Sequence, residues 1–151
     1  MRKSPKKKKK EIVVCTSGGF DPVHPGHINM FNAAKKLGDK HVVILNGDGW
    51  LMRKKGKFFM SAQDRREVLL NLRSVDDSVI WDDGRDDVSA ALASIRPHIF
   101  ANGGDRTDKN TPEKKVCRKL GIKMVFNVGG KKIRSSSELL GRYNLVLSER
   151  P

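Results

Sequence analysis

The chain has few of the residues and segments that mark secreted, membrane-spanning or metal-binding proteins. It contains only two cysteines, Cys15 and Cys117, and their spacing fits no metal site. No apolar run is long enough to cross a bilayer, and no segment resembles the hydrophobic core of a signal peptide. These absences predict a cytoplasmic protein with no membrane partner and with both thiols reduced and buried.

Aromatic residues are also scarce, at 6% of the chain, whereas the net charge is +14. About half of this excess lies in residues 1–10, which contain no acid and end in a run of lysines. Because residues 1–10 lack apolar periodicity, the sequence predicts a disordered basic tail there and one domain over 11–151. The tail suits weak binding of polyanions, and a solvated tail without function is equally compatible with its composition.

Short apolar runs alternate with helical patterns along the rest of the chain. Candidate strands cover 12–15, 41–45, 78–81, 98–101 and 123–126. Candidate helices cover 28–37, 61–72, 86–95, a segment that opens at 111–113, and 135–143. This alternation predicts an α/β fold: a single Rossmann-like domain with a five-stranded parallel sheet flanked by helices. Ligands of such sheets bind beyond the carboxyl ends of the strands, so the loops there should carry the chemistry.

Two connections carry more detailed expectations. A basic loop over 53–57 should join the second strand to the second helix. That helix, over 61–72, should turn Val68, Leu69 and Leu72 toward the core, because they lie on one face.

The run from Ser17 to His27 has the order of a phosphate site: strand, glycine pair, two histidines, helix. Gly18 and Gly19 lack a Cβ, so the backbone can approach a ligand closely. Pro25 suits the first helical position, which places His24 at the N-cap and His27 at the third helical residue. Both imidazoles can then face one ligand, and the helix N-terminus favours an anion and neutral histidines.

The segments at 18–22 (G-G-F-D-P) and 24–27 (H-P-G-H) resemble the H-x-G-H signature of the cytidylyltransferase-like nucleotidyltransferases. A capping His24 and a packed His27 in a generic Rossmann-like domain are the alternative interpretation. Later segments resemble further motifs of the family in the same order, so that the resemblance spans roughly residues 12–140. These segments are 46–48 (N-G-D), a basic stretch with Lys55 and Lys57, Arg65, 103–105 (G-G-D) and 135–137 (S-S-S).

The resemblance implies roles for residues in each of these segments. Catalysis is expected from His24, His27, Lys55, Lys57 and Arg65. Nucleotide binding is expected from Ser17, Gly18, Gly19, Phe20, Asp21, Gly103, Gly104, Asp105, Arg106, Ser135, Ser136 and Ser137. The second substrate is expected near Asp48 and Arg134, although Arg134 departs from the family pattern, which has a small or apolar residue there. Taken alone, the stretch at 53–57 is also compatible with a solvated basic turn, and the serines with a plain helix cap.

The implied reaction is nucleotidyl transfer, in which a phosphorylated sugar or alcohol attacks the α-phosphate of a nucleoside triphosphate and expels pyrophosphate. Mg²⁺ is expected on the phosphate oxygens, and no residue is assigned as a metal ligand because the sequence shows no carboxylate cluster. The double glycine at 103–104 resembles the adenylyltransferase domain of ADP-heptose synthases more than glycerol-3-phosphate cytidylyltransferases, which favours ATP over CTP. The sequence leaves the oligomeric state open, a homodimer included.

Two rival functions remain open from the sequence. One is a class I synthetase-like module that forms adenylates, although the chain is short for an added tRNA-binding or amino-acid-binding domain. The other is a basic α/β domain that binds nucleic acid without catalysis. That function would need clustered cations with interleaved aromatic residues, and outside the tail the cations are spread over loops and helix surfaces.

Overall fold

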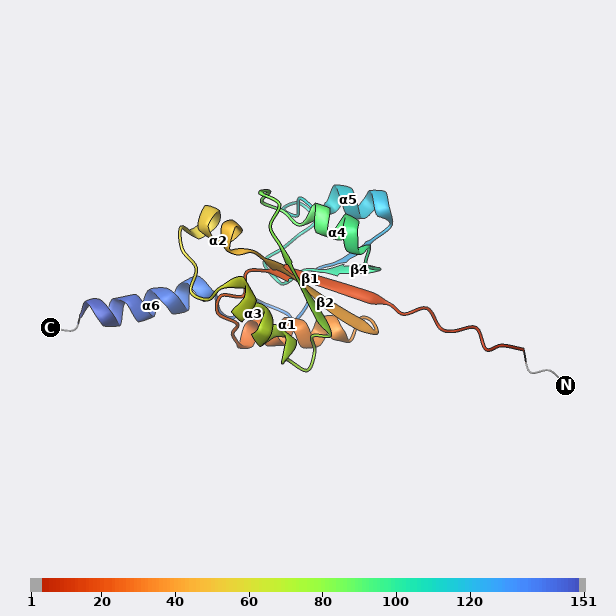
Figure 1. Cartoon of the computed structure of the whole chain (residues 1–151), viewed down its shortest axis with the longest axis horizontal. Coiled ribbons are helices and arrows are strands. Elements are labelled where there is room, and N and C mark those ends of the chain that lie inside the picture. Colours follow the sequence, from red (N-terminus) through yellow and green to blue (C-terminus); the bar gives the residue numbers. More distant parts are fainter. Residues whose placement is uncertain (1–3, 150–151) are drawn as a thin grey trace.

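The computed structural model describes residues 4–149, which form one parallel sheet and the helices that flank it (Figure 1). The strands are β1 (Val13–Gly18), β2 (Lys40–Asn46), β3 (Asp77–Trp81), β4 (Ile99–Ala101) and β5 (Lys123–Val125). The helices are α1 (Pro25–Lys35), α2 (Asp48–Lys55), α3 (Ala62–Leu70), α4 (Ser89–Ile95), α5 (Lys114–Leu120) and α6 (Ser136–Ser148). The strands lie in the order β3-β2-β1-β4-β5, and all neighbours are parallel, so the predicted fold class is confirmed.

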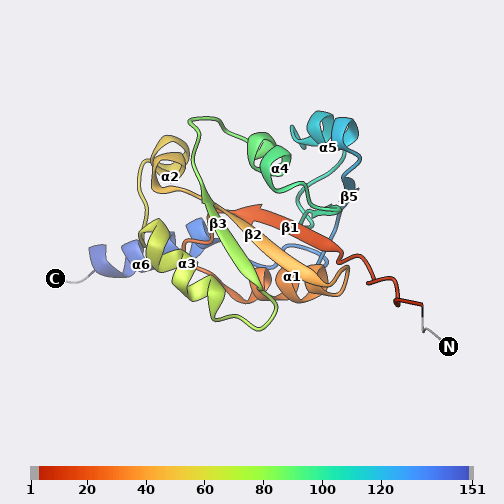
Figure 2. The ribbon, with the colours of Figure 1, turned by 45° about the vertical axis from the view of Figure 1, so that its right-hand side comes forward.

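Helices cover both faces of the sheet, as Figure 2 shows, with α4 and α5 on one face and α1 and α3 on the other. The side chains of β2 divide between the two layers. Val42 and Ile44 pack with Leu92 of α4, whereas Val43 and Leu45 pack with Phe31 of α1. A continuous apolar run is therefore required in β2, because both of its faces are buried.

The carboxyl ends of the strands meet at one edge of the sheet. Gly18, the last residue of β1, pairs with Leu45 near the end of β2, and Asn46 pairs with Trp81 at the end of β3. Ala101 and Val125 close β4 and β5 side by side. The loops that follow β1, β2, β4 and β5 are thus brought together, and the order of the strands reverses between β1 and β4, which is where such sheets bind ligands.

The basic segment after β2 is a helix, and the predicted loop at 53–57 is wrong for most of its length. Helix α2 ends at Lys55, and Gly56 caps it in the left-handed conformation (φ 72°). Leu51 anchors the helix, since it is fully buried against Gly19. The sequence did not predict this helix because its basic residues suggested a loop. The contact of Leu51 with Gly19 depends on the loop after β1, which is distant in sequence.

Helix α3 turns a charged residue toward the interior, which the sequence pattern did not predict. Its buried side chains are Ala62, Arg65 and Leu69, whereas Val68 is 40% exposed, so the predicted burial of Val68 is wrong. An arginine occupies the inner position because loop carbonyls and one carboxylate there accept its hydrogen bonds, described below.

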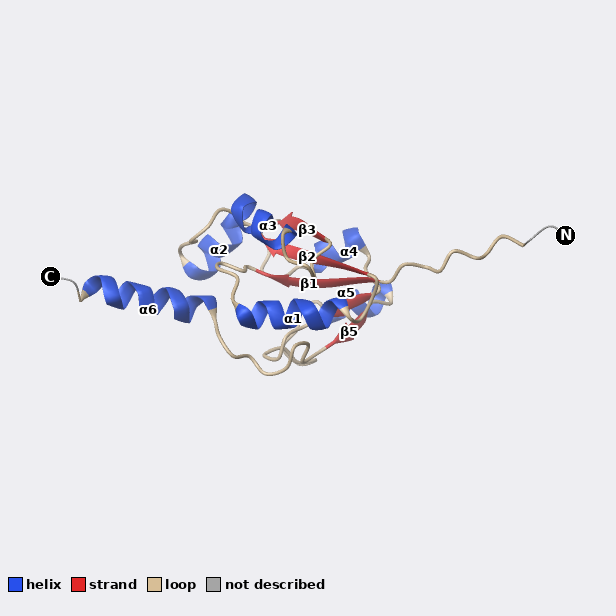
Figure 3. Ribbon diagram, turned by 90° about the horizontal axis from the view of Figure 1, so that it is seen from below, coloured by secondary structure: helices blue, strands red, loops and turns tan. Residues whose placement is uncertain are grey.

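The two ends of the described chain extend from opposite ends of the domain (Figures 1 and 3). Residues 4–10 are exposed and form neither helix nor strand. Residues 1–3 of the predicted basic tail lie outside the described residues, and disorder of the tail stays a prediction. None of the helices in the described range is long and apolar enough to cross a bilayer.

Candidate active site

A cleft of about 320 Å³ lies over the carboxyl ends of β1 and β4. Its walls are the loops after β1, β4 and β5, the first turn of α1, and Trp50 of α2. Its volume is at the lower end of the range for small-molecule sites. The cleft brings together most of the residues predicted from the sequence, namely Ser17, Gly18, Gly19, Phe20, His24, His27, Gly103, Gly104, Asp105, Arg106 and Arg134.

Two histidines cap helix α1 with their side chains. His24 is the N-cap, and its Nδ1 accepts a hydrogen bond from the Gly26 N–H (3.1 Å). His27 is at the third helical position, and its Nδ1 accepts from the His24 N–H (3.3 Å). An Nδ1 that accepts a hydrogen bond carries no proton, so each neutral ring must hold its proton on Nε2. The helix start thus fixes the tautomer of both histidines.

The same surroundings keep both histidines neutral. Burial lowers the pKa of His27 from 6.5 to about 3, with further lowering by His24, Lys132 and Lys55. Burial, followed by the charges of Lys132 and Arg134, lowers the pKa of His24. The rings stack with centroids 3.6 Å apart. Within residues 4–149, the buried Nε2 of His24 has no hydrogen-bond partner, so its proton is available to a ligand in the cleft.

Two neighbours fix the positions of the imidazoles. A Cβ at Gly26 would lie 3.0 Å from the Cε1 of His24, so any side chain at this position would require the imidazole to shift from its place over the helix start. The ring of Phe20 packs edge-on against His27 (4.8 Å between centroids) and against Phe31 of the core (4.9 Å). Phe20 is itself buried, so it packs between His27 of the cleft and Phe31 of the core.

The opposite wall of the cleft is formed by two glycine-rich loops in close contact. A Cβ at Gly104 would overlap the carbonyl oxygen of Gly130, and a Cβ at Gly129 would lie 2.7 Å from the Cα of Met30. Gly129 also has a left-handed φ of 83°. Across this junction Lys132 pairs with Asp105 at 3.2 Å. Backbone groups therefore dominate this end of the cleft, where they can lie close to a flat ligand.

Several predicted site residues bind within the protein instead. Arg65 is fully buried: its Nη1 donates to the carbonyl oxygens of Gly19 (2.7 Å) and Asn46 (2.8 Å), and its Nε to that of Met60 (3.0 Å). Its Nη2 pairs with Asp48 Oδ1 at 2.8 Å. These bonds use all three nitrogens of the guanidinium and join the loop after β1, the end of β2 and the segment before α3. Arg65 does not line the cleft, and its expected contact with phosphate stays a prediction.

Three further residues of the predicted nucleotide site also make internal contacts. The carboxylate of Asp21 accepts the N–H groups of Phe59 (2.6 Å) and Met60 (2.8 Å). Ser135 caps α6 through the N–H of Glu138, and the hydroxyl of Ser136 donates to the carbonyl of Pro22 (2.8 Å). These residues hold the loop after β1 against the segment before α3 and against α6.

The remaining predicted cations do not line the main cleft. Lys55 and Lys57 border a second cleft of about 340 Å³ together with Asp21 and Ser137. This cleft lies between the end of α2 and the start of α6. The predicted site is thus divided between two neighbouring hollows on either side of the loop after β1.

Sequence reasoning missed part of the cleft wall. Asn29 and Met30 line it from α1, Trp50 from α2, and Lys131, Lys132 and Ile133 from the loop before α6. The lysines could have been found beside Arg134, since they extend its basic run. Trp50 gave no signal, because one tryptophan after N-G-D-G has no periodic pattern to place it.

Comparison with known proteins agrees with this geometry. The family model described as cytidylyltransferase-like matches residues 15–151. The chain belongs to the cytidylyltransferase-like family. It is a nucleotidyltransferase, so the expected enzyme class is confirmed.

The chain is 35% identical over 113 residues to an FAD synthase of Aciduliprofundum boonei, across 75% of this chain and 74% of that protein. It is 33% identical over 137 residues to the bifunctional protein HldE of Pelobacter propionicus, across 87% of this chain but 28% of that protein. The expected resemblance to ADP-heptose synthases is thereby confirmed, whereas that to FAD synthases was not foreseen. Among solved structures, the lipopolysaccharide core biosynthesis protein of Thermoplasma volcanium matches with a TM-score of 0.68 and 30% identity, across 83% of this chain and 100% of that one.

Proposed function

We propose that this protein is an adenylyltransferase, which transfers AMP from ATP to a phosphate monoester and releases pyrophosphate. The observation that carries the proposal is the stacked pair of neutral histidines at the start of α1, whose tautomers leave Nε2 as the donor. Neutral donors hydrogen-bond to phosphate oxygens without taking up a proton from solution at neutral pH. They suit a reaction in which negative charge grows on the α-phosphate during transfer.

The roles of the other groups follow from where they lie. Lys132 and Arg134 are close enough to the histidines to lower the pKa of His24, so they also act on the charge of a triphosphate in the cleft. Lys55, at the second cleft, contributes to the low pKa of His27 and is placed to act on the same charge. Mg²⁺ enters with the nucleotide, since it favours phosphate oxygens and water over an all-protein cage. Catalysis then consists of alignment and charge stabilisation.

Arg65 acts in this reaction as a positioning residue. It joins the carbonyl group of Gly19, in the loop that leads to the histidines, to that of Asn46 at the end of β2, and it pairs with Asp48 at the start of α2. Its fixed planar guanidinium can satisfy several acceptors at once. The loop that leads to the histidines and the end of β2 are therefore held at one spacing before substrate binds.

ATP is the proposed donor nucleotide, with CTP as the alternative. Gly103 has no side chain at the end of the cleft beside Met30, and a purine needs more room than a pyrimidine. The names of the FAD synthase and HldE relatives support adenylyl transfer.

A phosphorylated sugar or alcohol is the acceptor that the sequence favoured, and FMN is the second candidate. The similarity to FAD synthases over most of their length supports FMN. Both acceptors present a phosphate monoester as the nucleophile, so the chemistry at the histidines is the same.

Pyrophosphate release tests the proposal. Each of the four nucleoside triphosphates is combined with Mg²⁺ and, in turn, with glycerol 3-phosphate, sugar phosphates and FMN. We expect release to depend on ATP and on one acceptor, and to be lost in His24→Ala. Release with CTP alone would replace the nucleotide but keep the reaction, whereas no release with any pair would refute the function.

A further inference from the structure

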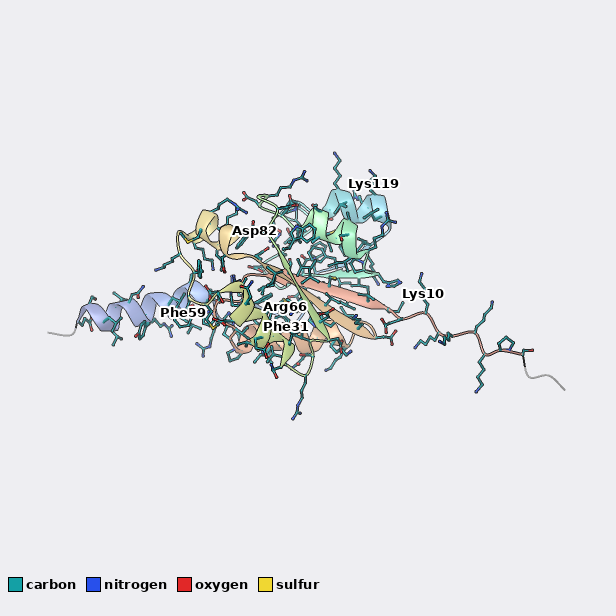
Figure 4. The ribbon with its side chains drawn as sticks, viewed as in Figure 1. Lys10, Phe31, Phe59, Arg66, Asp82 and Lys119 are labelled. Atoms are coloured by element: carbon teal, nitrogen blue, oxygen red, sulfur yellow. The ribbon has the colours of Figure 1, made fainter. Side chains whose placement is uncertain are left out.

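Trp50 is held rigidly at the edge of the active-site cleft. Its backbone N–H donates to Asp82 Oδ2 (3.0 Å), and its Nε1–H donates to the carbonyl of Asp86 (3.1 Å). Asp82 and Asp86 belong to the loop after β3. Their ion pairs with Arg53 (3.1 Å) and Lys54 (2.9 Å), respectively, hold this loop against α2. Figure 4 labels Asp82, which lies between α2 and the end of β3.

These contacts decide what Trp50 offers to a ligand. The only polar atom of the indole is already bonded to Asp86, so the part of Trp50 that lines the cleft is hydrocarbon. Its Cζ3 would lie 4.0 Å from a Cβ placed at Gly19, so the ring stands directly beside the glycine pair of the loop after β1. A flat aromatic surface beside a phosphate-binding loop is suited to stacking on a ring attached to that phosphate.

Trp50 and the glycine-rich wall lie at opposite ends of the cleft. In the sheet β1 stands between β2 and β4, and Trp50 belongs to the helix that follows β2. Gly103 and Gly104 follow β4, and Gly129 follows β5, on the other side of β1. The histidines, which follow β1, lie between the two ends. The histidines therefore separate two ends of the cleft, one lined by Trp50 and the other by the glycine-rich loops.

We propose that the ring of Trp50 is the surface on which the acceptor stacks, and that the acceptor carries a flat ring on its phosphate. This inference rests on the proposed function, because it takes the glycine-rich end as the place of the nucleotide base. The indole has no free hydrogen-bond donor for sugar hydroxyls. An aromatic ring system such as that of FMN matches it better than a sugar does.

Kinetics of two variants test this assignment. Trp50→Leu keeps an apolar side chain but removes the π surface, and Trp50→Phe keeps an aromatic face. We expect Trp50→Leu to raise KM for FMN about tenfold, because stacking contributes on the order of one to a few kcal/mol. Trp50→Phe should retain most of the affinity for FMN. The Kd for ATP should stay unchanged in both variants.

A binding measurement separates failure of this inference from failure of the proposed function. Stacking on an indole quenches flavin fluorescence, so FMN should be quenched by the wild type and by Trp81→Phe, which leaves Trp50 as the sole tryptophan, but not by Trp50→Leu. If the wild type releases no pyrophosphate, the function fails while this titration still tests Trp50. An unchanged Kd for FMN in Trp50→Leu, a weaker Kd for ATP, or stronger binding of ribose 5-phosphate than of FMN would each overturn the inference.

Discussion

Replacing Arg65 by leucine should destabilise this protein far more than the same change at Arg66, the next residue of the same helix. Arg65 is fully buried and makes four hydrogen bonds to three separate segments. Arg66, labelled in Figure 4, makes one bond to the carbonyl of Ser78 (2.7 Å) and a 3.6 Å ion pair with Asp77. Both side chains of that pair are more than 40% exposed, so Arg66 is a matched control.

The expected size of the effect follows from the partners left behind. Leucine at position 65 would strand the carbonyl oxygens of Gly19, Asn46 and Met60, and each unsatisfied buried acceptor costs about 1–3 kcal/mol. It would also remove the partner of Asp48, whose side chain is 35% exposed and can turn to water. Loss of one member of a buried charged network typically costs about 3–5 kcal/mol, and we expect a value in that range. Arg66→Leu should cost less than about 1 kcal/mol.

Urea unfolding measures both variants against the wild type, with the slope m as a check that the unfolded states are comparable. Turnover is then compared at a temperature where every variant is folded. We expect Arg65→Leu to lower kcat even when folded, because the loops after β1 and β2 lose their shared anchor. A loss of stability below about 1 kcal/mol with unchanged kcat would refute the positioning role.

Three further predictions concern the histidines and lysines. His24→Ala and His27→Ala should each lower kcat, measured by pyrophosphate release, by roughly a hundredfold or more, whereas ATP affinity, measured by calorimetry, should change little. Wild-type turnover by both variants would refute the catalytic role of the histidines. The pKa of His27 is lowered from 6.5 to about 3 in the folded protein, so the stability that its neutral form provides is fully present above pH 6.5 and is lost as pH falls toward 3. The midpoint of urea unfolding should therefore fall less between pH 7 and pH 4 in His27→Gln than in the wild type. An equal fall in both proteins would contradict the lowered pKa. Lys55→Ala with Lys57→Ala should raise KM for ATP and weaken its dependence on salt, whereas unchanged values would leave the two lysines as solvated surface charges.

The sequence predicted the helix start that carries the site with good accuracy, because that structure is local. Pro25 is the first helical residue, His24 is the N-cap and His27 is at the third position, as the order of residues required. Capping geometry depends on a few consecutive residues, so it can be read from a short segment. The alternation of strands and helices was predictable for the same reason.

The roles of Arg65, Asp21 and Trp50 could not be predicted in the same way. Arg65 was expected at the phosphates because its type and position suit them, but its partners lie 46, 19, 17 and 5 residues away in sequence. Asp21 binds the N–H groups of residues 38 and 39 positions later. No local pattern reveals such contacts, since they exist only after the strands are paired.

The sequence by itself determined the class of fold and the position of the histidine pair, because periodicity, capping and glycine placement act over a few residues. The family was indicated by the resemblance of short motifs to those of known proteins. The tertiary structure decided the ionisation state of the histidines and the binding partners of Arg65. Burial and the neighbouring cations set the pKa of His27, and hydrogen bonds across the loops turned Arg65 inward. Desolvation and hydrogen-bond partners arise only when distant segments meet, so the chemistry of a charged side chain is settled by packing and not by its place in the sequence.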